Sequence, residues 1–185
     1  KILMSDFLSR VAVDILESFS KIHRVAILVT SKRTERALRR ALMDEAASPI
    51  ISPVIFTIEQ FMMDLSGLST ANTMDQLIVL YDSYKKIKNN KAESFEDFLK
   101  WSPTVLKDFD EIQRFGVDID KVYKDLKEIE SISQWGLEKP TKLMTRRINL
   151  WKEIPELFKM FKKNMENEGI GTPGHIFNSA SPANT

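Results

Sequence analysis

Residues 25 to 42 read VAILVTSKRTERALRRAL, and this stretch decides the fold of the first part of the chain. It begins with a short apolar run, passes through a polar break, and continues as a segment with five basic side chains and one acid. Residues 24 to 30 are compact and apolar, which predicts a strand buried on both faces of a parallel sheet. A helix is expected to begin near Ser31 or Lys32.

The segments on either side extend this pattern. SDFLSRVAVDILESFSKI, at residues 5 to 22, places apolar side chains at helical spacing. SPVIFT repeats the strand signal at residues 52 to 57, and IEQFMMDLSGL follows as another helix. Helix, strand, helix, strand and helix in this order are typical of a crossover connection in a parallel sheet. We therefore expect an α/β fold over about the first 65 residues.

The rest of the chain is predicted to be helical. No convincing strand pattern follows Gly67, whereas apolar side chains recur at helical spacing up to Glu168. The final segment, GTPGHIFNSASPANT, is rich in Gly, Pro, Ser and Asn and is expected to be irregular. The predicted architecture is α/β: a short parallel sheet with helices on its faces in residues 1–68, a mainly helical subdomain in residues 69–168, and an irregular tail in residues 169–185.

The composition argues against several functional classes. The chain has 185 residues, a net charge of +1, two histidines and no cysteine. Lack of cysteine excludes disulfides and thiolate metal sites, and it is compatible with a reducing cytoplasm. No apolar run approaches the roughly 18 residues that a membrane span requires. Because the sequence has no GxxxxGK[ST], GxSxG or HExxH motif, we expect no catalysis, no cofactor and no metal in these residues.

Basic side chains are concentrated in local patches. Residues 32–40, KRTERALRR, hold five bases against Glu35, and residues 85–91, KKIKNNK, hold four bases and no acid. Patches of this kind can bind phosphate groups, but they also coat the solvated faces of ordinary helices. From charge alone, the solvated face is the favoured interpretation.

The stretch LVTSKRTERALRRAL resembles motif Ia of UvrD-type superfamily 1 helicases, which has the form T-x-T-N-K-A-A-x-E-M and contacts single-stranded DNA. Thr30, Ser31 and Lys32 lie where that family has Thr, Asn and Lys. One unit later, VIFTIEQFM is similar to motif Ib, T-x-H-S-F, with Thr57 matching the Thr and Phe61 the Phe. The resemblance implies a strand-turn-helix that contacts DNA.

Most of the chain also resembles the amino-terminal part of large PD-(D/E)XK nuclease proteins from Bacteroidetes-type bacteria, which are similar to AddB and RecC. The segments that carry this resemblance, in order, are FLSRVAVDIL, TSKRTERALRRAL, SPVIFTIEQFM, SFEDFLKWSPTVLKDFDEIQRF and LWKEIPELFKMFKKNMENEGI. In such proteins a helicase-like region has lost its ATPase function, and a nuclease domain lies far downstream. The resemblance implies a helicase 1A-type sheet, no ATP site, and a non-catalytic segment of a larger cytoplasmic repair nuclease.

The resemblance implies single-stranded DNA as the ligand, bound independently of its sequence, and no membrane. The ends of parallel strands gather loops and helix amino termini at one edge, where amide groups and the helix dipole favour phosphate. The candidate DNA-binding residues are Thr30, Ser31, Lys32, Arg33, Arg36 and Thr57. A helicase or nuclease subunit, or the remainder of the chain, is the other implied partner.

A second hypothesis stays open at this stage. The helical part, about residues 72–168, is also suited to docking a partner subunit or the remainder of its own chain without direct contact to DNA. Salt separates the two hypotheses, because phosphate contacts weaken steeply as salt rises, whereas an apolar docking face does not.

Overall fold

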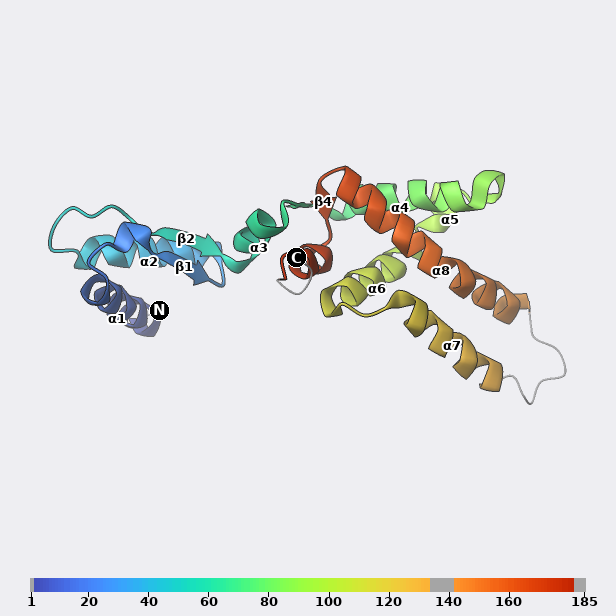
Figure 1. The fold of residues 1–185 in the computed structure, drawn as a ribbon, viewed down its shortest axis with the longest axis horizontal. Helices are drawn as coiled ribbons and strands as arrows, with labels where there is room; N and C mark the ends of the chain where they lie inside the picture. Colours follow the sequence, from blue (N-terminus) through green and yellow to red (C-terminus); the bar gives the residue numbers. More distant parts are fainter. Residues whose placement is uncertain (1, 134–141, 182–185) are drawn as a thin grey trace. The chain divides into compact units, whose positions relative to one another are not determined.

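The computed structural model describes residues 2–133 and 142–181, and Figure 1 shows the ribbon. The chain divides into two compact units, Lys1–Leu65 and Ser66–Thr185. The described residues are mostly helical, with two short parallel sheets of two strands each. None of their helices is both long and apolar enough to cross a bilayer.

The first unit alternates helices and strands in the predicted order. The helices and strands are α1 Ile2–Ser18, β1 Ala26–Val29, α2 Lys32–Glu45, β2 Val54–Thr57 and α3 Ile58–Ser66, with a short 3-10 helix at Ile22–Arg24. The two strands pair in parallel (Figure 1), with Ala26 opposite Val54 and Val29 opposite Thr57. The expectation of a small α/β unit with a parallel sheet is therefore confirmed.

Helix α2 holds this unit together through one apolar face. Leu38, Ala41 and Leu42 recur at helical spacing and are buried. They form a single cluster with Leu8 and Ala12 of α1 and with the inward strand residues. Full burial of each leucine stabilises the fold by about 1.5–3 kcal/mol, so this stripe outweighs the unfavourable charge on the opposite face of α2.

The prediction that the first strand is buried on both faces is wrong in the described structure. Burial alternates along the strands: Val29 and Ile55 face the helices, whereas Leu28 and Val54 are 50% and 48% exposed. The cause is that α1 and α2 pack in one cluster with the inward strand residues, which leaves Leu28 and Val54 exposed on the outward side. The apolar composition of β1 correctly predicted a strand but not which of its faces is covered.

The second unit is built mainly from helices, as expected. Its helices are α4 Thr73–Lys88, α5 Phe95–Phe98, α6 Ser102–Phe115, α7 Ile119–Ser133, α8 Lys142–Asn167 and α9 Pro173–Ser179, with a 3-10 turn at Asn89–Lys91. Phe98, Phe109 and Phe161 are fully buried within one large cluster. The ring of Phe109 contacts those of Phe158 and Phe161, with centroid separations of 5.0 and 6.0 Å.

Two expectations for the end of the chain are wrong. Strands β3 Ser69–Thr70 and β4 Ile170–Gly171 pair in parallel, although no strand was predicted beyond Gly67. Much of the segment expected to be an irregular tail forms β4 and α9. Helix α9 is ordered because Thr172 caps it, Pro173 occupies its first turn, and Ile176 is buried.

Candidate nucleic-acid interface

The candidate site lies at the carboxyl edge of the β1–β2 sheet. The parallel register places Val29 opposite Thr57, so the turn at Thr30 and Ser31 and the start of α3 leave the sheet at the same edge. Helices α2 and α3 both begin there. The structure thus brings together the two segments that the sequence pattern had paired, since consecutive parallel strands end on the same side.

Ser31 acts first as a helix cap. Its hydroxyl oxygen accepts a hydrogen bond from the backbone N–H of Thr34 at 3.2 Å and lies 2.9 Å from the Thr34 hydroxyl. This arrangement satisfies one of the amide groups that a helix start leaves without an intrahelical partner. The backbone amides of Lys32 and Arg33, at the first two helical positions, have no intrahelical acceptor in such a turn.

Thr57 is placed differently from the other candidate residues. It is only 4% exposed. Its hydroxyl accepts a hydrogen bond from the Gln60 backbone N–H at 3.2 Å and so caps the start of α3. The side chain that the motif resemblance offered as a DNA contact is therefore occupied in shaping the edge, and we remove Thr57 from the set of direct contacts.

The cations at the start of α2 form no ion pair with an acid in the part of the chain that the structure describes. Lys32, Arg33 and Arg36 are exposed, and none of them forms an ion pair with another residue in the described ranges. Thr30, just before the helix, is also exposed. We call these four residues the α2 cationic end.

Arg39 belongs to the same basic run but has a structural role. Its Nε and Nη2 donate to the Glu35 carboxylate, both at 3.1 Å, and its other contacts are the Ser52 hydroxyl at 3.1 Å and the Ile55 carbonyl at 3.4 Å. It therefore ties α2 to the residues around β2. Arg40 is highly exposed and lies 3.8 Å from Asp44, a pair that contributes little.

The α2 cationic end works against the stability of its own helix. Positive charge at a helix amino terminus opposes the dipole at a cost of about 0.3–1 kcal/mol. Lys32 and Arg36 are also four residues apart, where like charges repel by about 0.2–0.5 kcal/mol. A bound anion would relieve both effects. Side chains that destabilise a helix and make no stabilising contact in the described residues point to a functional role.

Each of the two helices that begin at this edge has one acid in its first turn. Glu35 of α2 pairs with Arg39 at 3.1 Å, whereas Glu59 of α3 is exposed. Its charge suits the amino end of α3 and makes that helix start a poor place for a phosphate. Anion binding at this edge is therefore directed to α2.

Other groups that sequence analysis could have assigned chemistry do not form a site. Asp110 accepts from the Gly174 backbone N–H at 2.6 Å and pairs with Arg114 at 3.1 Å, while Glu111 lies 3.9 Å from Lys107. Burial, followed by the charge of Glu111, raises the pKa of Asp108. Among the described residues no group of acidic or histidine side chains is arranged to hold a metal ion.

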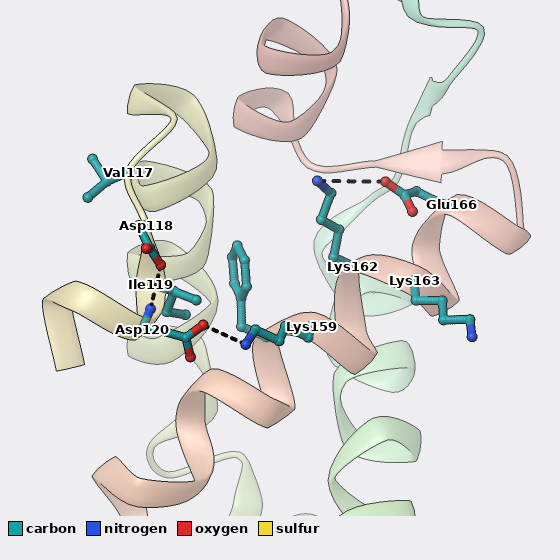
Figure 2. A pocket seen from close by; sticks show the side chains of 9 residues that line it. Val117, Asp118, Ile119, Asp120, Lys159, Lys162, Lys163 and Glu166 are labelled. Carbon is teal, nitrogen blue, oxygen red and sulfur yellow. Dashed lines mark hydrogen bonds and ion pairs between the residues drawn. The ribbon is translucent and has the colours of Figure 1, made fainter. Parts of the chain in front are cut away.

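A shallow hollow of about 410 Å³ lies in the second unit between α7 and α8 (Figure 2). Some of its charged groups are already paired: the Lys159 ammonium of α8 lies 2.6 Å from Asp120 of α7, and Lys162 lies 3.9 Å from Glu166 on the same helix. With three lysines and three carboxylates among its lining residues, the hollow has no dominant sign of charge to select a ligand.

Comparisons with known proteins do not assign the chain to a family. No family model, no curated protein and no solved structure matches it. The functional conclusion therefore depends on the geometry of the site and on the motif resemblance.

Proposed function

We propose that the α2 cationic end binds the sugar-phosphate backbone of single-stranded DNA, without reading its sequence and without catalysis. The observation that carries the proposal is that Lys32, Arg33 and Arg36 are exposed and unpaired at a helix start where cations destabilise the helix. Backbone amides and basic side chains at a helix amino terminus together suit a phosphate group. Thr30 and Ser31 supply hydroxyl groups beside it.

The wider assignment is part of the same proposal. The repeated strand-turn-helix and the parallel pairing of β1 and β2 support a helicase 1A-type unit. In this proposal the chain serves a larger cytoplasmic repair nuclease of the AddB- and RecC-like kind. Its other partner would be the remainder of that protein or a helicase or nuclease subunit.

The expected binding is modest and depends on salt. Neutralising about three phosphates on a single strand gives a slope near −2 for log K against log salt concentration, at roughly −0.7 for each contact. Docking of a protein partner through apolar surface would show a much flatter dependence. The salt slope therefore also separates DNA binding from the alternative of a docking module.

The decisive experiment measures fluorescence anisotropy of a labelled oligothymidine at low salt. The test variant replaces Lys32, Arg33 and Arg36 with Ala, and the matched control replaces Lys86, Lys121 and Lys124, which are exposed cations of the second unit. Both variants lose the same charge. The test variant should bind at least about tenfold more weakly, since a loss of about 1.4 kcal/mol is tenfold in affinity, and the control should bind like the parent.

Stability provides an independent readout of the same substitutions. Replacing Lys32 and Arg33 with Ala removes a cation-dipole conflict, so the thermal stability of the first unit should stay equal or rise by up to about 1 kcal/mol at low salt. A combined loss of stability and binding would mean that these side chains support the fold. Equal binding by the parent and the test variant would refute the proposal.

A further inference from the structure

The proposed function does not use the buried side chain of His175. This residue lies in α9 and is 1% exposed. Its Nε2 is 3.0 Å from Glu166 Oε1, whereas its Nδ1 is buried without a hydrogen-bond partner among the described residues. A titratable ring with one nitrogen paired and the other enclosed can be stable in only one protonation state.

Helix α9 is held by a small set of specific contacts around that ring. The Thr172 hydroxyl donates to Gln113 Oε1 at 2.9 Å, and the Gly174 backbone N–H donates to Asp110 Oδ1 at 2.6 Å. Ile176 is 2% exposed. A Cβ at Gly174 would lie 2.1 Å from the Asp110 carbonyl oxygen, so the two backbones are in close contact. The docking of this short helix depends on precise fit.

The hydrogen bond to Glu166 fixes the neutral tautomer. A carboxylate only accepts hydrogen bonds, so His175 Nε2 carries the hydrogen and Nδ1 holds a lone pair. A Cβ built on Gly171 would lie 3.4 Å from Nδ1, which shows how close β4 approaches this atom. Protonation would put an N–H donor into this enclosed position with no acceptor, which is unfavourable in a low-dielectric surrounding.

The charges around the ring do not compensate for that change. From α8 come Glu166, which attracts an imidazolium, and Lys162, which repels it and lies 3.9 Å from Glu166 (Figure 2). From α6 come Asp110 and Arg114, which pair with each other. The adjoining strands β3 and β4 carry no charge. Because Glu166 is 46% exposed, water screens its attraction.

We propose that α9 is an acid-sensitive latch: protonation of His175 releases residues 172–180 from α6 and β4 and uncovers the apolar surface beneath Ile176. At neutral pH the latch is closed. In acid the released segment keeps its covalent link to β4 but loses the fitted contacts at Gly174 and Thr172.

The direction of the pH dependence follows from the environment. Burial lowers the pKa of His175, and Glu166 only partly opposes this. The neutral ring is therefore favoured in the docked state, and the latch is fully stabilised above the ordinary histidine pKa of about 6.5. This stabilisation is lost as the pH falls below that value toward the lowered pKa of the docked state.

Amide hydrogen exchange of the whole chain, from about pH 7.5 to about pH 5, tests the latch in the range where histidine titrates. Exchange is corrected at each pH for its intrinsic rate. On acidification, the protection of residues 172–180 should fall by about tenfold for each unit by which the pKa of His175 is lowered. The protection of α4 and α6 should be retained.

The control is His23→Gln, because the exposed His23 is the only other histidine in the sequence. It should leave the acid response of α9 unchanged, and His175→Gln should abolish it. If His175→Gln itself releases α9 at neutral pH, the test compares the acid response of α9 in the parent, His23→Gln and Glu166→Gln, which all keep His175. Glu166→Gln removes an attraction for the imidazolium and should enlarge the acid response. Unchanged protection of α9 in acid, a loss shared equally by the whole second unit, or an unaltered response in Glu166→Gln would overturn the latch.

Discussion

The two units differ in where their polar and charged groups are used. In the described residues of the first unit, the cations at the start of α2 form no ion pair, and Leu28 and Val54 on the outward side of the sheet are half exposed. In the second unit, large rings fill the core, and polar groups such as Thr172 and Gln113 bond to each other inside it. Hydrogen bonds between polar groups inside a core specify one arrangement, whereas unpaired surface groups are available to a ligand. This contrast supports our proposal that ligand binding lies in the first unit.

The largest effect on stability is expected in the hydrophobic core of the second unit. Phe109→Ala should lower the free energy of unfolding by about 3–5 kcal/mol, because it leaves a cavity among packed rings. Phe115→Ala is a matched control, since Phe115 is 75% exposed and its loss should cost less than about 0.5 kcal/mol. Tryptophan fluorescence during denaturation reports on this unit alone, because all three tryptophans lie within it. Equal effects of the two substitutions would contradict the described core.

A smaller effect should distinguish two arginines of α2. Arg39→Ala removes the contacts to Glu35, Ser52 and Ile55 and should cost about 1 kcal/mol, a figure kept low because the side chain is partly exposed. Arg36→Ala should change stability by less than about 0.5 kcal/mol while weakening DNA binding. Hydrogen exchange across α2 and β2 measures the first effect and anisotropy the second. The opposite ranking for either quantity would show that the roles are reversed.

The smallest effect is expected on the open face of the sheet. Leu28→Thr should change the stability of the first unit by less than about 0.5 kcal/mol, because Leu28 is already half exposed. Ile55→Thr, on the covered face, should cost about 2 kcal/mol or more, since it removes buried apolar volume and buries a hydroxyl. Denaturation followed by exchange of the strand amides compares them. A large loss at Leu28 would mean that the outward face is covered in solution.

The sequence predicted an element correctly where a residue pattern repeats along it, and failed where a single tertiary contact determines the structure. Periodicity predicted β1, α2 and the helices of the second unit because many residues contribute to each pattern. Strands β3 and β4 have two residues each, which is too short for any period. The open outward face of β1 depends on which helices pack beside it, and an apolar strand looks the same whether one or both faces are covered.

The candidate DNA-binding site stays a prediction, and the structure shows only how its residues are placed. Lys32, Arg33 and Arg36 are exposed, as a contact with DNA requires. The burial of Thr57 was missed, although a threonine three residues before Gln60 is a recognisable capping pattern. Glu35 and Arg39 are four residues apart, a spacing that could have identified Arg39 as structural. Thr172 followed by Pro173 was likewise an available signal for the start of α9.

The pairing of β3 with β4 sets an order of events during protein synthesis. Ser69 aligns with Ile170, so β3 pairs with a strand about a hundred residues later in the sequence. Contacts of such separation form slowly. As the chain leaves the ribosome, α4 to α7 emerge before that partner does. Their helices can form locally, but β3 can pair with β4 only after α8 has emerged. The second unit is therefore completed from its last residues rather than its first.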